Sequence, residues 1–355
     1  MLKIETQVEL APLTTLRVGG RALHYTRVEH ATELDEALAW AKQRALEVRV
    51  LGGGSNIVVA DSGFPGLVID MALRGIRFHN LGTEVEVRAG AGEPWDELVA
   101  SMVLRGYQGL ECLSGIPGRV GATPIQNVGA YGQDVSETIS QVATLDTIRS
   151  SPRTFSAEEC QFSYRDSWFK SREPGRYIVT EVTFRLRPNA PPALRYVELE
   201  RHFLALGNTA PTLSELRQAV LQLRREKSML LDESDANGRS CGSFFLNPVL
   251  SNQQFQQFLA RAEGLGNLPQ FPQADGRVKL SAGWLIEQAG FPRGTRDGQV
   301  GLSTKHALAL VAHAGARADD VTRLARRVQL GVLERFGVRL EPEPVFWGNA
   351  QPTLA

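Results

Sequence analysis

The segment best suited to bind a ligand through its backbone is residues 116–132, which read IPGRVGATPIQNVGAYG. Proline removes a backbone donor and glycine weakens a helix, and the segment lacks the charged, serine-rich character of a linker. We interpret it as a fixed loop. Its N–H groups, the Thr123 hydroxyl and the amides of Gln126 and Asn127 suit the oxygens of a phosphorylated ligand. A chain of structural turns explains the composition equally well.

A second glycine run, residues 52–56 (GGGSN), separates two short apolar runs that predict strands over 48–51 and 57–59. Because a strand rather than a helix follows the glycines, we do not expect the helix-dipole phosphate site of the doubly wound dinucleotide fold. The sequence also carries no Walker loop. If a nucleotide binds, it lies on the two strand-flanked loops, 52–56 and 116–132.

Arg165 lies in a polar segment, 164–167 (YRDS), between the aromatic residues Phe162 and Trp168. An arginine fixed among aromatic rings can hold a carboxylate with both arms of its planar fork. The simpler alternative is a surface ion pair between Arg165 and Asp166, and the segment taken alone favours that alternative.

Ser243 lies in the segment 242–248 (GSFFLNP), between a glycine and two aromatic residues. A serine nucleophile would need a base, and the nucleophile-elbow pattern is absent from this segment. The hydroxyl could instead give a proton to a reacting carbon if its own proton loss is assisted. A buried serine bonded to the backbone is the simpler interpretation of this segment by itself.

Charged residues at the ends of predicted elements offer further polar groups. Glu341 and Glu343 alternate with prolines after a strand-like run at 338–340. Proline rigidity would fix a carboxylate there, although exposed Glu-Pro turns are common. The cations within 224–227 stand at the end of a helix that begins after Thr212, where they complement the helix dipole. The more specific alternative is that these cations bind a phosphate.

The composition argues against several classes of function. Among 355 residues, 39 Lys and Arg balance 39 Asp and Glu, whereas nucleic-acid-binding proteins are commonly basic. Three cysteines and six histidines are scattered without metal or haem spacing. The sequence shows neither a signal peptide nor a membrane-spanning run. We expect a cytoplasmic monomer with buried thiols that acts on small molecules, without a nucleic-acid, membrane or metal partner.

Apolar periodicity predicts an α+β fold, with a strand-rich N-terminal half and a more helical C-terminal half. The boundary is predicted at 189–192 (NAPP). In chain order we predict a helix capped by Thr32 and running to Ala45, strands at 48–51, 57–59, 67–69 and 84–88, a helix from Pro94, strands at 142–147 and 178–186, helices after Thr212 and around 255–259, strands at 307–312 and 338–340, and a helix over 321–336.

Seven ordered segments together resemble the UDP-N-acetylenolpyruvoylglucosamine reductase (MurB) family, flavoenzymes of peptidoglycan synthesis. Besides the segments above, the resemblance includes 16–20 (LRVGG) and 282–287 (AGWLIE), and it extends over nearly the whole chain. It implies tightly but non-covalently bound FAD, NADPH as co-substrate, and UDP-N-acetylglucosamine-enolpyruvate as the nucleotide-sugar substrate. It also implies an FAD-binding domain of the vanillyl-alcohol-oxidase/PCMH type, followed by a MurB-type α+β substrate-binding domain.

The resemblance sets the expected domain boundaries. An FAD-binding region would cover residues 1–205, with subdomains at about 1–70 and 71–205. A substrate-binding domain would cover residues 206–336, and a C-terminal strand segment, 337–355, would return to the active site.

The family's functional residues map onto this chain position by position. The resemblance implies hydride transfer from the flavin to the terminal carbon of the enolpyruvyl group. Arg165 would bind the carboxylate of that group, Ser243 would protonate the carbon beside the ether oxygen, and Glu343 would help to handle the charge. The expected FAD-binding residues are Gly52, Gly53, Gly54, Ser55, Asn56, Ile116, Pro117, Gly118, Thr123, Ile125, Gly129, Gly132 and Arg224. The expected substrate-binding residues are Tyr196, Lys227, Asn247 and Gln288, of which Tyr196 would belong to a loop that covers the substrate.

Three positions depart from the family's pattern. Thr14 stands where an asparagine is usual, Leu246 where a basic residue is common, and Pro344 where an aliphatic residue is usual. Two other functions stay open, namely another FAD-dependent oxidase or dehydrogenase of the same fold, and a nucleotide-sugar-binding protein without catalysis. The combination of Arg165, Ser243 and Glu343 argues against both, because these residue types serve a conjugated carboxylate.

Overall fold

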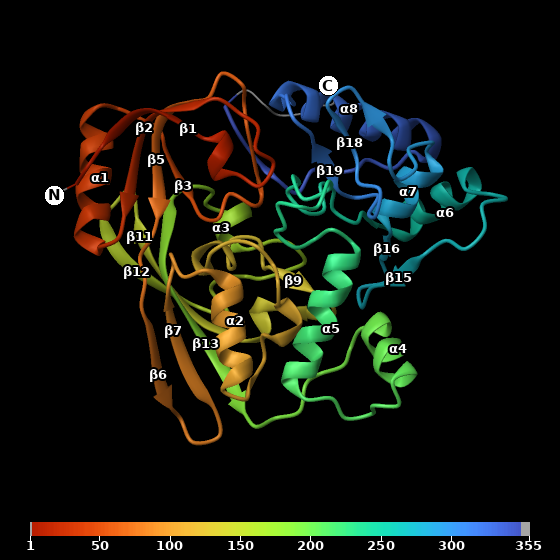
Figure 1. The fold of residues 1–355 in the computed structure, drawn as a ribbon, viewed down its shortest axis with the longest axis horizontal. Coiled ribbons are helices and arrows are strands. Elements are labelled where there is room, and N and C mark those ends of the chain that lie inside the picture. The colour runs from red at the N-terminus through yellow and green to blue at the C-terminus, as the bar shows by residue number, and fades with distance from the viewer. Residues whose placement is uncertain (1, 349–355) are drawn as a thin grey trace. The chain divides into compact units, whose positions relative to one another are not determined.

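The chain forms two compact units, which are described one at a time (Figure 1). The computed structural model describes residues 2–348, so residue 1 and the end of the predicted C-terminal segment, 349–355, lie outside the described residues. Unit 1 comprises Met1–Val8, Leu23–Gly53 and Pro65–Glu226. Unit 2 comprises Glu9–Ala22, Gly54–Phe64 and Lys227–Ala355.

Unit 1 combines strands with a few helices. Its elements are β1 (Glu5–Glu9), β2 (Arg21–Val28), α1 (Ala31–Gln43), β3 (Val48–Leu51), β5 (Phe64–Met71), β6 (Ile76–Asn80), β7 (Val85–Gly90), α2 (Trp95–Leu104), β8 (Tyr107–Gln108), η2 (Glu111–Leu113), η3 (Val120–Ala122), β9 (Gly129–Ala130), β10 (Gln133–Asp134), η4 (Val135–Glu137), β11 (Ile139–Asp146), β12 (Ser151–Ser156), α3 (Trp168–Ser171), β13 (Tyr177–Pro188), α4 (Val197–Ala205) and α5 (Leu213–Glu226). One end each of β1, β2 and β5 belongs to unit 2.

Two sheets form the core of unit 1. One has the strand order β12-β11-β13-β7-β6, with β8 paired to the end of β13, and the other has the order β1-β2-β5-β3. The pairs within the first sheet are antiparallel, whereas β3 and β5 run parallel. Helix α2 packs its apolar side into the same core, where the rings of Trp95 and Phe184 lie 5.9 Å apart.

Helix α5 and the short helix α4 add a small apolar cluster to unit 1. Helix α5 begins with a capping box, because the Glu215 N–H donates to the Thr212 hydroxyl (3.2 Å) and the Thr212 N–H to the Glu215 carboxylate (2.7 Å). From α4, Leu199 and Phe203 are buried against the apolar stripe of α5. This packing fixes the start of α4, which lies directly after Tyr196.

Unit 2 is a smaller α+β arrangement around the long helix α8. Its elements are η1 (Ala11–Leu13), β4 (Ile57–Val59), β14 (Val249–Leu250), α6 (Asn252–Arg261), β15 (Gln270–Pro272), β16 (Val278–Leu280), α7 (Ala282–Gln288), β17 (Arg296–Asp297), β18 (Val300–Leu302), β19 (Leu310–Ala312), α8 (Ala318–Phe336) and β20 (Val345–Trp347). The sheets are β14-β16-β15, β17-β18-β19 and the parallel pair β20-β4.

The ends of α8 show why the sequence folds there. Asp61 accepts the N–H groups of Ala318 (2.9 Å) and Asp319 (3.0 Å), so a carboxylate satisfies the positive end of the helix. Gly337, with φ +68°, ends the helix in the left-handed conformation that glycine adopts without strain. Between these ends, the helix buries Leu324, Val328 and other apolar side chains in the core of unit 2.

The predicted α+β class is confirmed, and the predicted strands 48–51 and 57–59 have the predicted bounds. Three local predictions are wrong. Of the predicted strand 307–312 only Leu310–Ala312 is a strand (β19), because the chain turns at residues 307–308. The first helix starts at Ala31 rather than after Thr32, because the Glu33 carboxylate accepts the N–H of His30 (3.1 Å) and so caps the helix earlier. Residues 338–340 are not a strand. Their apolar pattern reflects burial of Val338 and Leu340, and the Leu340 carbonyl accepts a bond from the Gln329 side chain (2.8 Å) instead of a strand partner.

Candidate active site

The first half of the glycine-rich loop, residues 116–122, packs against its own unit. The Gly121 N–H donates to the Ala91 carbonyl (2.9 Å), and the Val120 N–H donates to the Glu93 carbonyl (2.9 Å). A Cβ atom on Gly121 would lie 2.6 Å from the Cβ atom of Ala91, which is closer than real contacts allow. The interpretation as structural turns therefore accounts for Gly121.

The two glycine-rich loops meet in unit 1 at Gly53 and Gly118. A Cβ atom on Gly53 would lie 2.6 Å from the Gly118 Cα atom, so both positions depend on glycine. Within residues 2–348, the N–H groups of Gly52, Gly53 and Gly118 donate to no other backbone group. Backbone donors left open in tight turns suit phosphate oxygens. These positions therefore fit the pyrophosphate of a dinucleotide such as FAD.

Several side chains of the loop anchor it to unit 1. Ile116 and Ile125 pack against the core, and Pro117 is half-buried. The buried Thr123 hydroxyl donates to the Val120 carbonyl (2.8 Å), so its proton is used within the loop. The loop thus presents backbone more than side chains.

The Asn127 amide has a role that its sequence context did not indicate. Its Nδ2 donates to the Ser163 carbonyl (2.9 Å), and its Oδ1 accepts the Ser136 N–H (3.1 Å). Both ends of the amide are thus engaged within unit 1, although we expected it to face a phosphate. The amide instead joins the loop to the turn that carries Arg165.

After Asn127 the chain forms a small β-hairpin, residues 129–134, made of β9, Tyr131, Gly132 and β10. The strands pair Gly129 with Asp134 and Ala130 with Gln133. Tyr131 (φ +49°) and Gly132 (φ +77°) form the turn between them. Two consecutive positive φ angles identify a type I′ turn, in which asparagine and glycine are the usual residues. Gly132 fits this turn, whereas Tyr131 is held in a conformation that few side chains adopt.

Arg165 is held against this 129–134 hairpin. Its Nη1 lies 3.3 Å from the Asn127 carbonyl and 3.3 Å from Asp134 Oδ1, and its Nη2 donates to the Gly129 carbonyl. Arg165 itself has a positive φ of +54°, and its side chain is mostly buried. Arg165 therefore pairs with Asp134, a residue that no sequence motif marked, and not with Asp166 as the simpler alternative predicted.

Tyr196 and Arg224 both lie near Tyr131 in unit 1. The rings of Tyr131 and Tyr196 meet edge to face with centroids 5.3 Å apart. Burial lowers the pKa of Arg224, while the nearby Tyr131 and Asp96 oppose that change. Burial also raises the pKa of Tyr131 to about 12, so its phenol stays protonated at neutral pH. The structure therefore brings together one predicted substrate residue and one predicted FAD residue.

In unit 2 the segment that carries Ser243 pairs with the segment that carries Glu343. The Glu343 N–H donates to the Phe244 carbonyl (2.9 Å), and the Leu246 N–H donates to the Glu341 carbonyl (2.9 Å). The two extended segments thus pair in an antiparallel manner. Phe244 and Phe245 are fully buried and fix the backbone, whereas Ser243 and Glu343 are half-buried.

Other predicted residues of unit 2 lie near this pair or support it. Asn56 bonds on both sides of Pro344, because its Nδ2 donates to the Glu343 carbonyl (3.4 Å) and its own carbonyl accepts the Val345 N–H (3.0 Å). Asn247 Oδ1 accepts the Ala282 N–H (2.9 Å) and so caps α7. Gln288 is the last residue of α7.

Gly54 and Thr14 lie in a second turn region of unit 2. A Cβ atom on Gly54 (φ +64°) would lie 2.0 Å from the Leu13 carbonyl oxygen, so only glycine fits there. Thr14, beside it, donates to the Ala11 carbonyl (3.2 Å) and accepts the Arg17 N–H (3.1 Å). Thr14 is thus a turn residue in this chain. Ser55 and Lys227 are half-buried.

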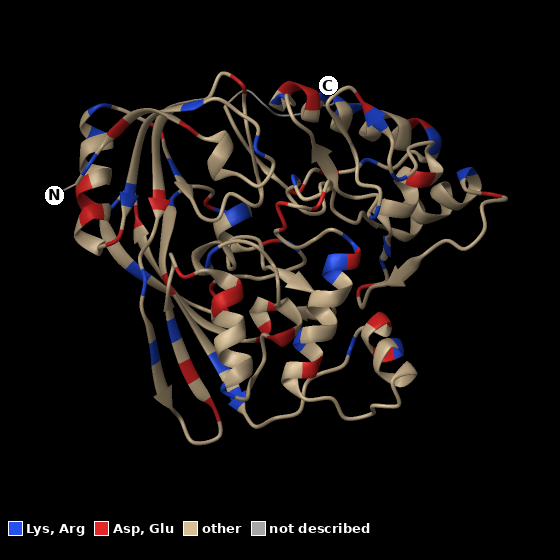
Figure 2. Ribbon diagram, viewed as in Figure 1, with Lys and Arg blue, Asp and Glu red and all other residues tan. Residues whose placement is uncertain are grey.

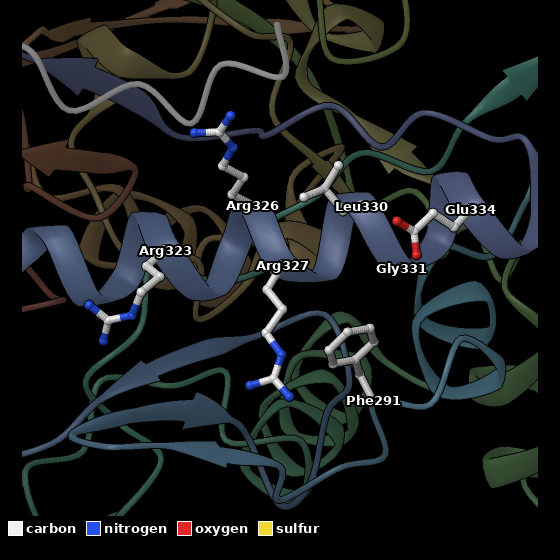
Figure 3. Close-up of a pocket in the computed structure, with 7 residues that line it drawn as sticks. All are labelled: Phe291, Arg323, Arg326, Arg327, Leu330, Gly331 and Glu334. Atoms are coloured by element: carbon white, nitrogen blue, oxygen red, sulfur yellow. The ribbon is translucent and has the colours of Figure 1, made fainter.

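A surface groove of about 450 Å³ on α8 contains none of these residues (Figure 3). Arg323 pairs with Asp320 (2.8 Å) and Arg327 with Asp297 (3.6 Å), and Arg326 leaves the helix on the opposite side from Arg323 and Arg327. Because two of its cations are already paired within unit 2, this groove is not a competing candidate for the site.

Charge and metal-binding groups are distributed evenly rather than gathered. Figure 2 shows acidic and basic residues interspersed on the elements of each unit. Within residues 2–348, no cluster of three or more His, Cys, Asp or Glu side chains could hold a metal ion. No helix of the described chain is long and apolar enough to cross a membrane. Cys112, Cys160 and Cys241 are buried free thiols.

The chain matches two family models that divide it in the same order. An FAD-binding domain model matches residues 22–150, and the model of the UDP-N-acetylenolpyruvoylglucosamine reductase C-terminal domain matches residues 233–347. The predicted succession of an FAD-binding domain and a reductase-type second domain is confirmed.

Relatives and a solved structure extend the likeness over the whole chain. The UDP-N-acetylenolpyruvoylglucosamine reductase of Thermobifida fusca is 48% identical, covering 96% of this chain and 97% of its own. That of Chromobacterium violaceum is 41% identical, covering 97% and 99%. The crystal structure of the reductase from Thermus caldophilus has a TM-score of 0.68 at 27% identity, covering 98% and 100%.

These results place the chain in a class of FAD-binding oxidoreductases with a second α+β domain. More specifically, the chain belongs to the UDP-N-acetylenolpyruvoylglucosamine reductase family. The resemblance stated from seven sequence segments is thereby confirmed.

Proposed function

We propose that this protein reduces UDP-N-acetylenolpyruvoylglucosamine to UDP-N-acetylmuramate, with FAD as bound cofactor and NADPH as reductant. The observation that carries the proposal is the likeness to the Thermobifida fusca reductase, which is 48% identical over 96% of this chain. Both domain models of such an enzyme also match in the expected order. The reaction belongs to the synthesis of peptidoglycan precursors.

The reaction adds two electrons and two hydrogens across the carbon–carbon double bond of the enolpyruvyl ether. NADPH supplies a hydride and becomes NADP⁺, and a proton completes the reduced product. FAD held by the residues named below would supply the two-electron carrier between NADPH and the terminal carbon of the double bond. The remaining steps concern the protein's own residues, which must hold the carboxylate and supply the proton at the neighbouring carbon.

We propose Gly52, Gly53, Gly54, Ser55, Asn56, Ile116, Pro117, Gly118, Thr123, Ile125, Gly129, Gly132 and Arg224 as the residues that hold FAD. The open N–H groups of Gly52, Gly53 and Gly118 support a pyrophosphate contact. The close approach of Gly53 to Gly118 supports a cradle formed by backbone alone.

Arg165 is proposed to bind the substrate carboxylate, where charge develops during hydride transfer. An arginine aimed at developing charge can lower a barrier by a few kcal/mol (about 3–4 for one oxyanion donor). Contacts with Asn127, Gly129 and Asp134 hold its guanidinium in one place before substrate arrives. Such preorganisation supports the role, because no reorganisation is needed during the reaction.

Ser243 is proposed to give its hydroxyl proton to the carbon beside the ether oxygen, with Glu343 in the same charge-handling group. The Glu343 N–H donates to the carbonyl of Phe244, the residue that follows Ser243, and this proximity of the two segments supports a shared task. Tyr196, Lys227, Asn247 and Gln288 are proposed to contact the sugar nucleotide.

For the domains, we propose an FAD-binding region over 1–205 with subdomains at about 1–70 and 71–205, a substrate-binding domain over 206–336, and a returning segment over 337–355. The matches at 22–150 and 233–347 support this order. We also propose that the protein is a cytoplasmic monomer serving cell-wall growth and division, without nucleic-acid or membrane partners. The buried free thiols support a reducing compartment.

The test is NADPH oxidation by purified protein, followed by its absorbance with and without the enolpyruvyl sugar nucleotide. We expect a yellow protein with flavin absorbance, oxidation that depends on the sugar nucleotide, and one UDP-N-acetylmuramate formed per NADPH. Oxidation driven by dioxygen alone, with the sugar nucleotide without effect, would favour a flavin oxidase and contradict the proposal. A colourless protein that binds the sugar nucleotide would favour a binding protein.

A further inference from the structure

We propose that the 129–134 hairpin is a positioning device that sets Arg165 through Asp134 and Tyr196 through Tyr131. Neither Asp134 nor Tyr131 would touch the reacting atoms. The inference rests on the proposed function, because it assigns the purpose of holding Arg165 and Tyr196 to substrate binding and reduction. All of the contacts that carry it lie within unit 1.

The hairpin is itself anchored, so it can serve as a fixed reference. Gln133 is buried, and its side-chain oxygen accepts the Cys112 N–H (3.0 Å). The ladder continues past the strands, because the Val135 N–H donates to the Val128 carbonyl (2.9 Å). Rigid support of this kind is what a catalytic arrangement needs if groups must stay within a fraction of an ångström of their places.

On one side the hairpin closes around the Arg165 guanidinium. Asp134 Oδ1 lies 3.3 Å from Arg165 Nη1, and the Gly129 carbonyl accepts from Nη2. Gly129 leaves the necessary room, since a Cβ atom there would lie 1.5 Å from Asp134 Oδ1 and 2.7 Å from Arg165 Nη1. A carboxylate and two carbonyl oxygens together fix both the position and the plane of the guanidinium.

On the other side the hairpin turn meets the segment that carries Tyr196. Tyr131 contacts the Tyr196 ring edge to face at 5.3 Å. Glu137, just beyond the hairpin, accepts a bond from Arg195 (2.7 Å). A Cβ atom on Gly132 would lie 3.2 Å from the Arg195 Cβ atom. The Tyr131–Tyr196 ring contact ties the hairpin to Tyr196, and the bond from Arg195 to Glu137 ties the neighbouring residue to the segment just beyond the hairpin.

The conformation of Tyr131 indicates that its ring serves the contact rather than the turn. Tyrosine at positive φ in a type I′ turn is strained relative to asparagine or glycine. An edge-to-face aromatic pair stabilises its two rings beyond their burial. If the turn alone mattered, asparagine would be the better residue at position 131. Keeping tyrosine there makes sense when the ring has to hold Tyr196.

The proposal has two arms, Tyr131 with Tyr196 and Asp134 with Arg165. The first is tested by the affinity for the sugar nucleotide and the second by the rate of flavin reoxidation. For Tyr131→Asn we expect at most a small change in melting temperature, because asparagine suits the turn while the packing of the ring against the apolar cluster of α4 and α5 is lost. The Kd of the sugar nucleotide should rise about 2- to 12-fold, the equivalent of the lost aromatic pair. Tyr131→Phe keeps the ring and should restore the wild-type Kd. A wild-type Kd for Tyr131→Asn would overturn this arm of the proposal.

For Asp134→Asn we expect the rate of flavin reoxidation by substrate to fall about tenfold, the lower range for losing a hydrogen bond to a charged group. Flavin reduction by NADPH should keep its rate. Asp35→Asn, which neutralises an exposed acid of α1 in the same unit, is the matched control and should change neither step. Equal slowing of both steps in Asp134→Asn would mean a general structural role and overturn the proposal.

Double variants decide whether the two positioning residues act through their partners. In the Tyr196→Ala background, Tyr131→Asn should add no further loss of affinity, and in the Arg165→Lys background, Asp134→Asn should add little loss of rate. Full additivity in either cycle contradicts that arm. Failure of the proposed function is recognised separately, because the wild-type protein itself would then show no turnover that depends on the sugar nucleotide.

Discussion

Arg165 in unit 1 and the Ser243–Glu343 pair in unit 2 are held by different means. Arg165 depends on the side chain of Asp134 and on the carbonyl groups of Asn127 and Gly129. Ser243 and Glu343 are placed by backbone bonds between two extended segments, over fully buried phenylalanines. A single substitution nearby can displace a group that is held by side chains, whereas a group held by backbone pairing keeps its place.

The reaction should therefore respond differently to substitutions in the two regions. Around Ser243, a substitution should act through the group that it removes and leave the backbone pairing intact. Around Arg165, substitutions at positions that never meet the substrate should still alter the reaction. Substitutions in each region test this difference.

Ser243→Ala should have the largest effect, on one half-reaction only. Loss of a proton donor slows such steps about 100- to 10,000-fold, so flavin reoxidation by the sugar nucleotide should fall by that range. NADPH should still reduce the flavin, and the melting temperature should stay, because the backbone pairing is unchanged. Rapid mixing of each half-reaction provides the measurement.

Ser234→Ala is the control for that variant, since Ser234 is an exposed serine of the same unit. It should behave as wild type in both half-reactions. An equal loss of both half-reactions in Ser243→Ala would contradict the proton-donor role.

Arg165→Lys should have the next largest effect, because one ammonium cannot reproduce the planar fork. A charged hydrogen bond contributes about 1.5–3 kcal/mol, so kcat/KM for the sugar nucleotide should fall roughly 10- to 150-fold. The variant should also melt at a lower temperature, since the contacts to the hairpin are lost. Steady-state kinetics and thermal unfolding check both outcomes. Near-normal turnover would refute the fork-like grip.

Gly121→Ala tests the half of the loop that packs on its own unit. The new Cβ atom would lie 2.6 Å from the Ala91 Cβ atom, and overpacking of this kind typically costs about 1–3 kcal/mol. Unfolding in urea should therefore shift to lower concentration. Gly266→Ala is the matched control, because nothing lies within 4 Å of a Cβ atom there. Equal stability of the two variants would contradict the packing role of Gly121.

Asp146→Asn concerns a pair that holds the fold rather than the site, so it should leave catalysis the least changed of these variants. Hydrogen bonds from Arg176 lower the pKa of Asp146 to about 2. Because this pKa lies below the unfolded value of about 3.9, the pair stabilises the fold above that value and loses the effect as pH falls toward 2. The wild type should be more stable than the variant at pH 7, with the difference vanishing in acid. A difference that persists in acid would contradict this assignment.

The sequence was informative where several short motifs occur in a characteristic order along the chain. The family and the succession of two domains followed from seven short segments, and the fixed loop at 116–132 was recognised from its glycines and prolines. Strands 48–51 and 57–59 were found because apolar runs bounded by glycines leave few alternatives.

The supporting contacts could not be predicted, because they join residues far apart in the chain. Asp134 lies 31 positions from Arg165, and no local pattern marks it as the partner. Tyr131 occupies a turn position where its residue type argues against the turn, so turn chemistry alone would miss the hairpin. The apolar run at 338–340 predicted a strand because burial and strand pairing give the same pattern in short segments.

The most direct test of the account is the reaction of the NADPH-reduced protein with the enolpyruvyl sugar nucleotide in the absence of dioxygen. The account predicts complete return of the oxidised flavin spectrum and one UDP-N-acetylmuramate per flavin, in the wild type but at a greatly reduced rate in Ser243→Ala. A wild-type flavin that stays reduced in the presence of the sugar nucleotide would contradict it.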